Sequence, residues 1–492
     1  MRGPHRNATA SNWLRLGLRT SVCIALGALP SCVVDDAAGE GPPNLVAPLA
    51  AAHPAHVYLD PVAADADPSA PRTGRVCSSD GPGYRCFAHV HADAVGEHVE
   101  PSDSPQGYTP ADLQDAYSVP TALTSHPLVG VVDAYAYPNL ESDLAAYRAQ
   151  FDLPACTSKN GCLRIVGQDG TSNLPTQTSL DAGLTDDWTV ETALDVDMVS
   201  AACPQCNILV VLADDKVGYG LDIGQGTAAQ LGARVISDSW GGPEQPGVSL
   251  AAVENYFDQS VPIFAAAGDQ GYDDGGSGPD YPGTSAHTIS VGGTSLVKAS
   301  NARGWSETAW SLGGSACSLS IGKPAYQTNT NCQFKATTDI SAEGDPVIGM
   351  AMYNADNGGW TTIGGTSAAA PFVAALFAAT GNDAAGTTGA FVAANPAKLH
   401  DVTSGSNGAC GNSLCVAGAG WDGPTGYGTP DGAQLDTGKY EGDNPYAAGE
   451  DPGVVSGGCS ASGASGGDGG LALAFAALAL LSVIGVARRL AH

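Results

Sequence analysis

Apolar runs alternate with longer helical patterns through the middle of the chain. Six short apolar runs predict strands at 128–134, 163–167, 207–213, 234–240, 262–268 and 288–294. Helices are predicted at about 139–151, 188–202, 218–232, 247–260 and 366–380. Almost continuously apolar strands separated by helices are typical of a parallel sheet that is buried on both faces. We therefore expect an α/β fold of three layers, with a mostly parallel central sheet covered by helices on both faces.

In such a sheet, binding and catalytic residues gather at the carboxyl ends of the strands. The positions of interest therefore follow residues 239, 268 and 294, and a further one is the start of the helix 366–380. Polar side chains at these positions are the first candidates for chemistry.

The chain divides by composition into five segments. Basic residues and then the apolar run "VCIALGALPSC" predict a signal peptide at 1–32, in which Cys32 after "LPS" resembles a lipoprotein cleavage site. Residues 33–107 are expected to be an Ala/Pro/Asp-rich linker with a short disulfide-containing segment. The globular domain is expected at 108–435, followed by a Gly/Ser/Asp-rich spacer at 436–470.

The last segment, 471–492, contains an apolar stretch at 471–487 that can roughly span a thin bilayer core. Arg488 and Arg489 would stay on the cytoplasmic side. Together with Cys459 and the spacer, these features resemble the C-terminal sorting tails of myxobacterial surface proteins, and a plain single-span anchor is the alternative. Both interpretations predict an exported protein, extracellular or at the outer envelope of a Gram-negative bacterium, with membrane contact through this segment.

The charge balance is strongly acidic, with 50 Asp and Glu against 20 Lys and Arg and a net charge of −30. No basic patch is available to neutralise phosphates, so we expect no nucleic-acid partner. A well-solvated surface accounts for this balance. An acidic habitat, in which many carboxyls carry protons, is the alternative.

Ten of the thirteen cysteines fall into five short-range pairs. These are Cys77/Cys86, Cys156/Cys162, Cys203/Cys206, Cys317/Cys332 and Cys410/Cys415. Local pairs in a chain with export signals indicate disulfides and an oxidising compartment. The Cys203-Pro-Gln-Cys206 pair could instead be a redox motif or half of a zinc site.

The segment "GGTSAAAP" places Ser367 at the start of a predicted buried helix. Gly364 and Gly365 allow a tight turn and a close approach by substrate. Free N–H groups at the helix N-terminus favour developing negative charge nearby. Ser367 is therefore a candidate nucleophile, and an ordinary helix-capping serine is the alternative.

A nucleophilic serine needs a general base. In subtilisin-type proteases this base is a histidine at the start of an early helix, and no histidine of this chain is predicted to lie at such a position. None of the ten histidines is followed by Gly, so the "HGT" helix start of subtilisin-type proteases is absent. The predicted domain contains His126, His287 and His400, none of which opens an early helix. His89 and His91 alternate on an extended segment, where a surface strand is a simpler interpretation than a metal site.

Two carboxyls of the predicted helix 188–202 offer another base. Glu191 and Asp195 are four residues apart and lie on one helical face together with Leu194 and Met198. Asp197 points elsewhere and is expected to be solvated. Two inward carboxyls in contact cannot both ionise cheaply, so the pair should share a proton and act as general acid and base under acidic conditions.

A third acid follows the strand 262–268 in "AAGDQG". Proteases of the subtilisin type usually carry Asn here, which donates a hydrogen bond to the oxyanion. The carboxyl of Asp269 can donate only when it is protonated, which again indicates a low working pH. A simple turn aspartate is the alternative.

Together these segments resemble the sedolisins, the serine-carboxyl peptidases, which have a subtilisin-like fold and a Ser-Glu-Asp site that is active in acid. The matching segments are "ETALD" (191–195), "SDSWGG" (237–242), "AAGDQG" (266–271), "SVGGT" (290–294) and "GGTSAAAP" (364–371). The resemblance covers about residues 108–430. It implies that Ser367 is the nucleophile, Glu191 its general base, Asp195 the residue that supports Glu191, and Asp269 the oxyanion donor.

The resemblance also implies one structural calcium ion. Its ligands map onto the carboxylates of Asp401 and Asp422 and the backbone carbonyls of Val402, Gly418 and Gly420. Five oxygens and a water suit this hard cation.

We therefore expect an exported, monomeric acid endopeptidase that cuts protein or peptide substrates through an acyl-enzyme on Ser367. A neutral subtilisin-like protease and a catalytically inactive surface-binding module on the same fold are the alternatives. Residues 33–107 are too few for the long N-terminal propeptide that sedolisins usually carry, so self-inhibition and self-cleavage stay open.

Overall fold

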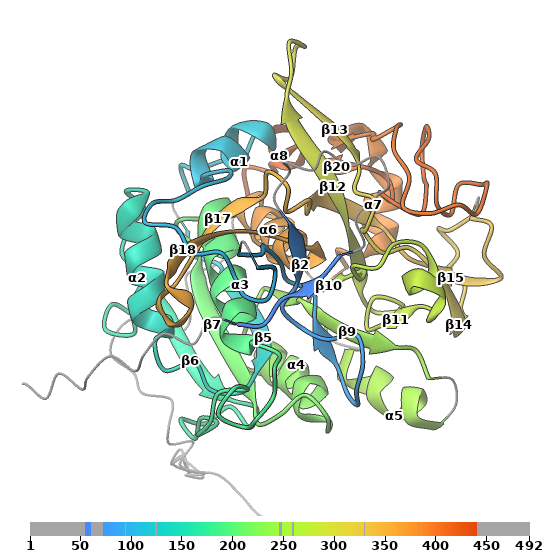
Figure 1. The fold of residues 1–492 in the computed structure, drawn as a ribbon. Helices are drawn as coiled ribbons and strands as arrows, with labels where there is room; N and C mark the ends of the chain where they lie inside the picture. Colours follow the sequence, from blue (N-terminus) through green and yellow to red (C-terminus); the bar gives the residue numbers. More distant parts are fainter. Residues whose placement is uncertain are drawn as a thin grey trace, which may run out of the picture. The chain divides into compact units, whose positions relative to one another are not determined.

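An eight-stranded sheet forms the centre of the protein (Figure 1). The computed structural model describes residues 55–60 and 72–439, except 94, 124, 246–247, 258–259, 329 and 385. The strand order is β13-β12-β10-β8-β5-β7-β6, with β16 beside β12. Every described pair is parallel except β12 with β13. The expected subtilisin-like α/β fold with a mostly parallel sheet is confirmed.

The strands of this sheet follow the predicted apolar runs closely. They are β5 (Leu128–Ala134), β6 (Leu163–Gly167), β7 (Asn207–Ala213), β8 (Val235–Asp238), β10 (Ile263–Ala266), β12 (Ile289–Lys298), β13 (Trp305–Ala309) and β16 (Ile340–Glu343). The run predicted at 234–240 is divided, because β8 ends at Asp238 and Trp240–Pro243 form β9 in a separate sheet.

Helices cover both faces of the sheet. The bounds are α1 (Pro110–Ala116), α2 (Leu140–Gln150), α3 (Trp188–Ala202), α4 (Gly220–Gln230), α5 (Val248–Phe257), α6 (Thr366–Ala379), α7 (Gly389–Ala394) and α8 (Gly432–Leu435). Helices α3 and α6 pack on each other and on the sheet, while α4 packs on β5, β7 and α5. Helix α4 and the α3–α6 pair contact the same strand, β5, without extensive packing on each other, so they lie on opposite faces.

Helix α3 differs from the predicted amphipathic helix. All 15 of its residues are buried, because α1, α2 and β17 (Met350–Asn354) cover the side that does not face α6 and the sheet. The expectation that Asp197 is solvated is therefore wrong. Its side chain is 1% exposed, and its Oδ2 accepts a hydrogen bond from the Tyr353 N–H at 3.1 Å.

Part of the segment expected to be linker forms strands against the rest of the fold. In one antiparallel sheet the order is β1 (Tyr58–Leu59), β2 (Thr73–Arg75), β4 (His89–His91), β18 (Gly359–Gly364) and β17. In another, β3 (Arg85–Cys86) pairs with β9, which also pairs with β11 (Asp280–Tyr281). The remaining short strands are β14 (Cys317–Gly322), β15 (Phe334–Ala336), β19 (Leu399–His400) and β20 (Thr429–Pro430).

The five predicted cysteine pairs are all disulfides: Cys77–Cys86, Cys156–Cys162, Cys203–Cys206, Cys317–Cys332 and Cys410–Cys415. The bond between Cys203 and Cys206 favours the disulfide ring over a half-zinc site. Within the described part of the chain, no helix is both long and apolar enough to cross a membrane. The predicted signal peptide, the apolar tail and the predicted spacer from residue 440 onward lie outside the described residues.

Candidate active site

Ser367 lies in the first turn of α6, directly after β18. Gly365 joins the two elements with φ of 97°, a conformation that strongly favours glycine. The Ser367 hydroxyl is fully buried and donates to the Ser239 carbonyl at 2.9 Å. Pro371 has no N–H to bond the Ser367 carbonyl four residues earlier, and this carbonyl accepts from the Ser239 hydroxyl at 3.3 Å. The nucleophile candidate is thus fixed between two backbone segments.

Glu191 and Asp195 lie on α3, which packs against α6, and neither side chain is exposed. Within the described residues, no hydrogen bond of 3.5 Å or less reaches any of their four carboxyl oxygens. The Ser367 hydroxyl and the Ala88 N–H lie near Glu191 and favour its charged form, against the effect of burial. Packing of α3 on α6 thus brings the predicted carboxyl pair to the helix that carries Ser367.

Burial controls the protonation of these acids. Burial first, and then the charge of Asp133, raise the pKa of Glu191 and of Asp195 well above their ordinary values. Burial also raises the pKa of Asp133 to about 7, against the effect of the Thr192 hydroxyl. The three carboxyls form one cluster that keeps protons at weakly acidic pH.

Sequence reasoning missed Asp133, although a signal was present. Asp133 is the penultimate residue of β5 and sits at the carboxyl end of a central strand, where polar groups were expected. Its side chain is fully buried, and neither of its oxygens has a hydrogen-bond partner within the described residues. Its place beside Glu191 and Asp195 makes it part of the candidate site.

Asp269 lies three residues after the end of β10 and contacts the start of α6. Its Oδ1 accepts from the Thr366 N–H at 2.9 Å and from the Thr366 hydroxyl at 2.7 Å. These bonds fix the carboxyl at the start of α6, while Oδ2 has no hydrogen-bond partner within the described residues. Burial raises the pKa of Asp269 to about 6, although His89 and Thr366 favour its charged form.

His89 is the second residue that sequence reasoning missed. His89 was expected to lie on a surface strand. It does lie on a strand, β4, but it is fully buried, so the expected exposure is wrong. Its Nδ1 is 3.3 Å from Asp60 Oδ2 and its Nε2 is 3.3 Å from Asp269 Oδ2. Burial lowers the pKa of His89, but Asp60 and Asp269 raise it by more, so the net change is upward. The sequence marked His89 only as one of an alternating histidine pair in a segment expected to be linker, and gave no sign of its contact with Asp269.

Residues 84–91, which we call the covering segment, pass directly over Ser367. The Phe87 N–H donates to the Ser367 hydroxyl oxygen at 3.0 Å and to the Ser239 carbonyl at 3.3 Å. A Cβ placed on Gly365 would lie 1.9 Å from the Phe87 carbonyl oxygen and 2.8 Å from Asp269 Oδ2. The Phe87 carbonyl therefore lies against Gly365, on the side of the Asp269 carboxyl.

The residues of the expected calcium site also come together. The Asp422 carboxyl accepts from the Gly418 N–H at 2.8 Å, and the Asp401 carboxyl from the Gly420 N–H at 3.0 Å. The pKa of Asp422 is raised to about 6, mainly by burial, and the charge of Asp401 also contributes. Within the described ranges no group of three or more His, Cys, Asp or Glu could hold a metal ion. The expected calcium site contains two carboxylates, and its other expected ligands are backbone carbonyls, so it is a different kind of group.

Comparisons with known proteins agree with this geometry. The family described as Subtilase family (Peptidase S8) matches residues 182–420. Kumamolisin from Bacillus sp. (strain MN-32) is 30% identical over 381 residues, which cover 70% of this chain and 66% of kumamolisin. Sedolisin from Pseudomonas sp. (strain 101) is 28% identical over 394 residues, which cover 72% of this chain and 63% of sedolisin.

A solved structure supports the same assignment of the fold. It is Pseudomonas sedolisin (serine-carboxyl proteinase) complexed with two molecules of pseudo-iodotyrostatin, with a TM-score of 0.56 and 25% sequence identity. The match covers 68% of this chain and 98% of that chain. The two curated relatives are longer, and this chain spans 66% and 63% of their lengths.

Proposed function

Because these matches support the sedolisin family of serine peptidases, we propose that the chain is an acid-active serine-carboxyl endopeptidase. It hydrolyses peptide bonds in proteins through an acyl-enzyme on Ser367. Glu191 is the general base, and it shares protons with Asp195 and Asp133. Asp269 is the oxyanion donor.

The observation that carries this proposal is a peptide backbone lying across the site. The Phe87 carbonyl lies against Gly365 and the Phe87 N–H is on the Ser367 hydroxyl. The next amide nitrogen, that of Ala88, is beside Glu191. A carbonyl near the serine and a leaving nitrogen near the acid are the two positions that acyl transfer requires.

The proposed steps conserve protons at each stage. In the form of the cluster in which Asp133 and Asp195 hold the protons and Glu191 is ionised, Glu191 takes the Ser367 hydroxyl proton as the oxygen attacks the carbonyl carbon, and protonated Asp269 donates from Oδ2 to the oxyanion. Glu191 then gives the proton to the leaving nitrogen, the C–N bond breaks, and the acyl-enzyme forms. A water repeats the sequence, with its proton passing through Glu191 back to Ser367.

The pKa of Asp269 links this mechanism to acid. Since burial raises that pKa to about 6, Asp269 is mostly protonated below pH 6 and mostly ionised above it. Only the protonated form can donate to an oxyanion. Activity should therefore fall as pH rises through about 6.

A histidine base is disfavoured by the position of His89. Its two ring nitrogens face Asp60 and Asp269, at 3.3 Å each, and no described hydrogen bond joins it to Ser367. The Ser367 hydroxyl instead favours the charged form of Glu191. The carboxyl pair is therefore the better candidate for the base.

We also propose the calcium site. The Asp422 carboxyl is buried, and the charge of Asp401 is one of the causes that raise its pKa, so the two carboxylates lie near each other. The Thr425 hydroxyl, 3.5 Å from the Val402 carbonyl, shows that Val402 lies against the same loop. Calcium would be held by these two carboxylates and by the carbonyls of Val402, Gly418 and Gly420, and would link residues 401–402 to the loop.

Export, membrane contact and a monomeric state remain part of the proposal. The five disulfides support an oxidising compartment outside the cytoplasm. Peptidase relatives support protein or peptide substrates for this chain.

The test is cleavage of a denatured protein by the full chain between pH 3 and pH 8. We expect cleavage in acid and its loss, by at least about a thousandfold, in Ser367→Ala, because the nucleophile is removed. Ser104→Ala, which changes an exposed serine, is the control and should retain wild-type activity. Equal activity of Ser367→Ala and wild type would exclude this mechanism.

A further inference from the structure

The covering segment crosses the cleft as an extended strand with partners on both sides of Ser367. Before Ser367, β3 pairs antiparallel with β9, with Arg85 opposite Gly241. Beyond Ser367, β4 pairs antiparallel with β18, with His89 opposite Gly364. Extended peptides bind proteins by adding a strand in this way, with side-chain pockets that give specificity.

The contacts of Phe87 fix the register of this strand. The Phe87 N–H reaches the Ser367 hydroxyl and the Ser239 carbonyl, and the Phe87 carbonyl lies against Gly365, so the bond between Phe87 and Ala88 occupies the reactive position. Phe87 thus stands where a substrate places the residue whose carbonyl is attacked. Arg85 is two residues and Tyr84 three residues before it.

Phe87 fills space that a glycine leaves open. Its side chain is 1% exposed, and a Cβ on Gly241 would come within 2.9 Å of two of its ring carbons. The absence of a side chain at Gly241 therefore makes room for an aromatic ring at this position. The Arg85 guanidinium lies 5.5 Å from the centre of the same ring, as expected for residues two apart on one face of a strand.

Arg85 enters a buried acidic subsite. Its Nη2 is 2.7 Å from Asp274 Oδ2 and 2.9 Å from Asp280 Oδ2, and all three side chains are at most 7% exposed. The two aspartates belong to the chain between β10 and the end of β11, which is part of the peptidase domain and not of the covering segment. The cleft itself therefore carries the acceptors for a cation.

Tyr84 extends the contact further along the cleft. Its ring packs on Trp240 at 4.6 Å between centres, and its hydroxyl donates to Asp222 at 2.8 Å. A cavity of about 450 Å³ opens beside it, lined by residues that include Tyr219, Gly242 and Tyr281. This position has room for an aromatic side chain.

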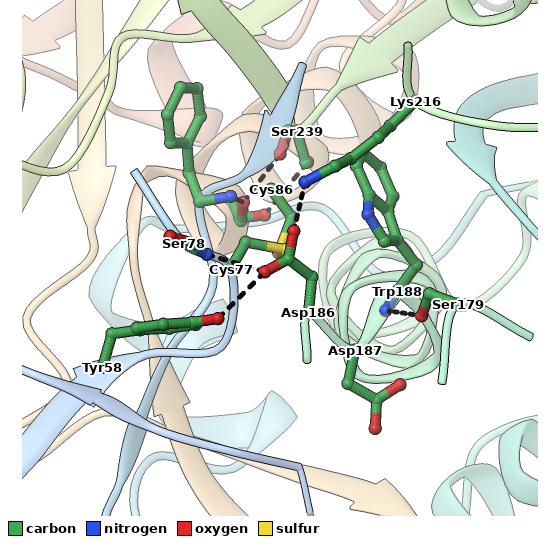
Figure 2. The surroundings of a disulfide bond; sticks show 12 residues. Tyr58, Cys77, Ser78, Cys86, Ser179, Asp186, Asp187, Trp188, Lys216 and Ser239 are labelled. Atoms are coloured by element: carbon green, nitrogen blue, oxygen red, sulfur yellow. Dashed lines mark hydrogen bonds and ion pairs between the residues drawn. A yellow bond between two sulfur atoms is a disulfide. The ribbon is translucent and has the colours of Figure 1, made fainter. Parts of the chain in front are cut away.

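A disulfide ring holds the covering segment independently of these side chains. Figure 2 shows the Cys77–Cys86 bond close to Asp186, just before α3. Asp186 accepts from the Ser78 N–H at 2.9 Å and pairs with Lys216 (Figure 2). This anchor uses none of the side chains of Tyr84, Arg85 and Phe87, whose partners Asp222, Asp274, Asp280 and Gly241 belong to the peptidase domain.

We propose that the peptidase prefers substrates that place an aromatic residue at the attacked carbonyl, arginine two residues before it and an aromatic residue three residues before it. Asp274 and Asp280 are then the residues that determine specificity for arginine. This inference rests on the proposed peptidase function and adds its substrate class.

The test is a competition between two peptides in one reaction with the full chain at pH 4. One is Gly-Tyr-Arg-Ser-Phe-Ala-His-Val, which copies residues 83–90 with Ser for Cys, and the other has Gln in place of Arg. The ratio of the two kcat/KM values does not depend on how much enzyme has an open cleft. We expect cutting between Phe and Ala, with the Arg peptide preferred by about tenfold or more, as for a hydrogen-bonded buried charge.

A substitution in the subsite gives the second measurement. Asp280→Asn keeps the shape but replaces one of the two oxygens that accept from the Arg85 guanidinium with an NH2 group, and should reduce the preference for the Arg peptide to about threefold or less. Asp103→Asn, which changes an exposed aspartate, is the matched control and should keep the full preference.

The outcomes separate the two proposals. Equal cutting of both peptides, an unchanged preference in Asp280→Asn, or cutting at another bond would overturn the specificity proposal and leave the peptidase function standing. Failure of the wild type to cut either peptide or its own Phe87–Ala88 bond would overturn the peptidase function itself.

Discussion

The two carboxyl oxygens of Asp269 have different surroundings, and this difference gives the residue its proposed role. Oδ1 is bound by the Thr366 N–H and hydroxyl, which orients the group. Among the described residues Oδ2 has no hydrogen-bond partner, and it faces His89 Nε2 at 3.3 Å. With the covering segment in the cleft, Oδ2, the oxygen proposed to donate to the oxyanion, therefore faces His89 of that segment. Movement of His89 with that segment would free it for substrate.

Asp269→Asn tests the link between this residue and acid. An amide donates without being protonated and can still accept from Thr366 through its oxygen. Since ionisation of Asp269 at about pH 6 no longer limits the reaction, we expect activity to extend to higher pH. The measurement is kcat/KM against pH for wild type, Asp269→Asn and the exposed control Asp103→Asn. An unchanged upper limit would show that Asp269 does not set it.

At the scale of secondary structure, long elements were predictable and short ones were not. The bounds of β5, β6, β7 and α3 agree with the sequence patterns, because buried runs of five or more residues have a recognisable period. Strands β1 to β4 have only two or three residues each and depend on their partners β9 and β18. No local pattern could therefore place the covering segment in the cleft.

The same limit explains the error on α3. Two acids four residues apart correctly indicated one face, since helix geometry alone decides that. The burial of Asp197 on another face is decided by α2 and β17, which come from distant parts of the chain. Periodicity within a helix contains no information about a second covering layer.

The loop that carries Asp422 allows a test of the calcium proposal at this scale. If calcium links residues 401–402 to 418–422, a chelator should lower the melting temperature of the full chain by about 2 to 4 °C or more. Asp422→Asn keeps one acceptor oxygen, enough for either the Gly418 or the Thr425 N–H group, and weakens the cation site. Its melting temperature should not respond to the chelator. A wild type that also shows no shift would refute the site.

For the whole molecule, the notable property is the number of acids inside it. Burial raises the pKa of Asp197, Asp238 and Glu343 well above the ordinary range. A carboxyl with a raised pKa in the folded state stabilises the fold fully below its unfolded pKa, and this stabilisation is lost as pH rises through the folded pKa. The interior is thus suited to acid, in agreement with the proposed chemistry. The net charge of −30 alone did not distinguish a well-solvated surface from an acidic habitat.

The site could be predicted in outline because its residues come from strand ends and helix starts. Ser367, Glu191, Asp195 and Asp269 were named from such positions, and the fold brings them together. His89 was not predictable, since its role depends on a crossing of the cleft that only the whole fold defines.

The central claim is that a carboxyl, not a histidine, is the base for Ser367. The most direct test compares kcat/KM at pH 4 and pH 7 for wild type, Glu191→Gln and His89→Gln, each first shown to be folded. We expect Glu191→Gln to lose at least about a hundredfold to ten-thousandfold, as for removal of a general base, while His89→Gln keeps an acid-active enzyme. Loss of activity in His89→Gln together with an active Glu191→Gln would contradict the account.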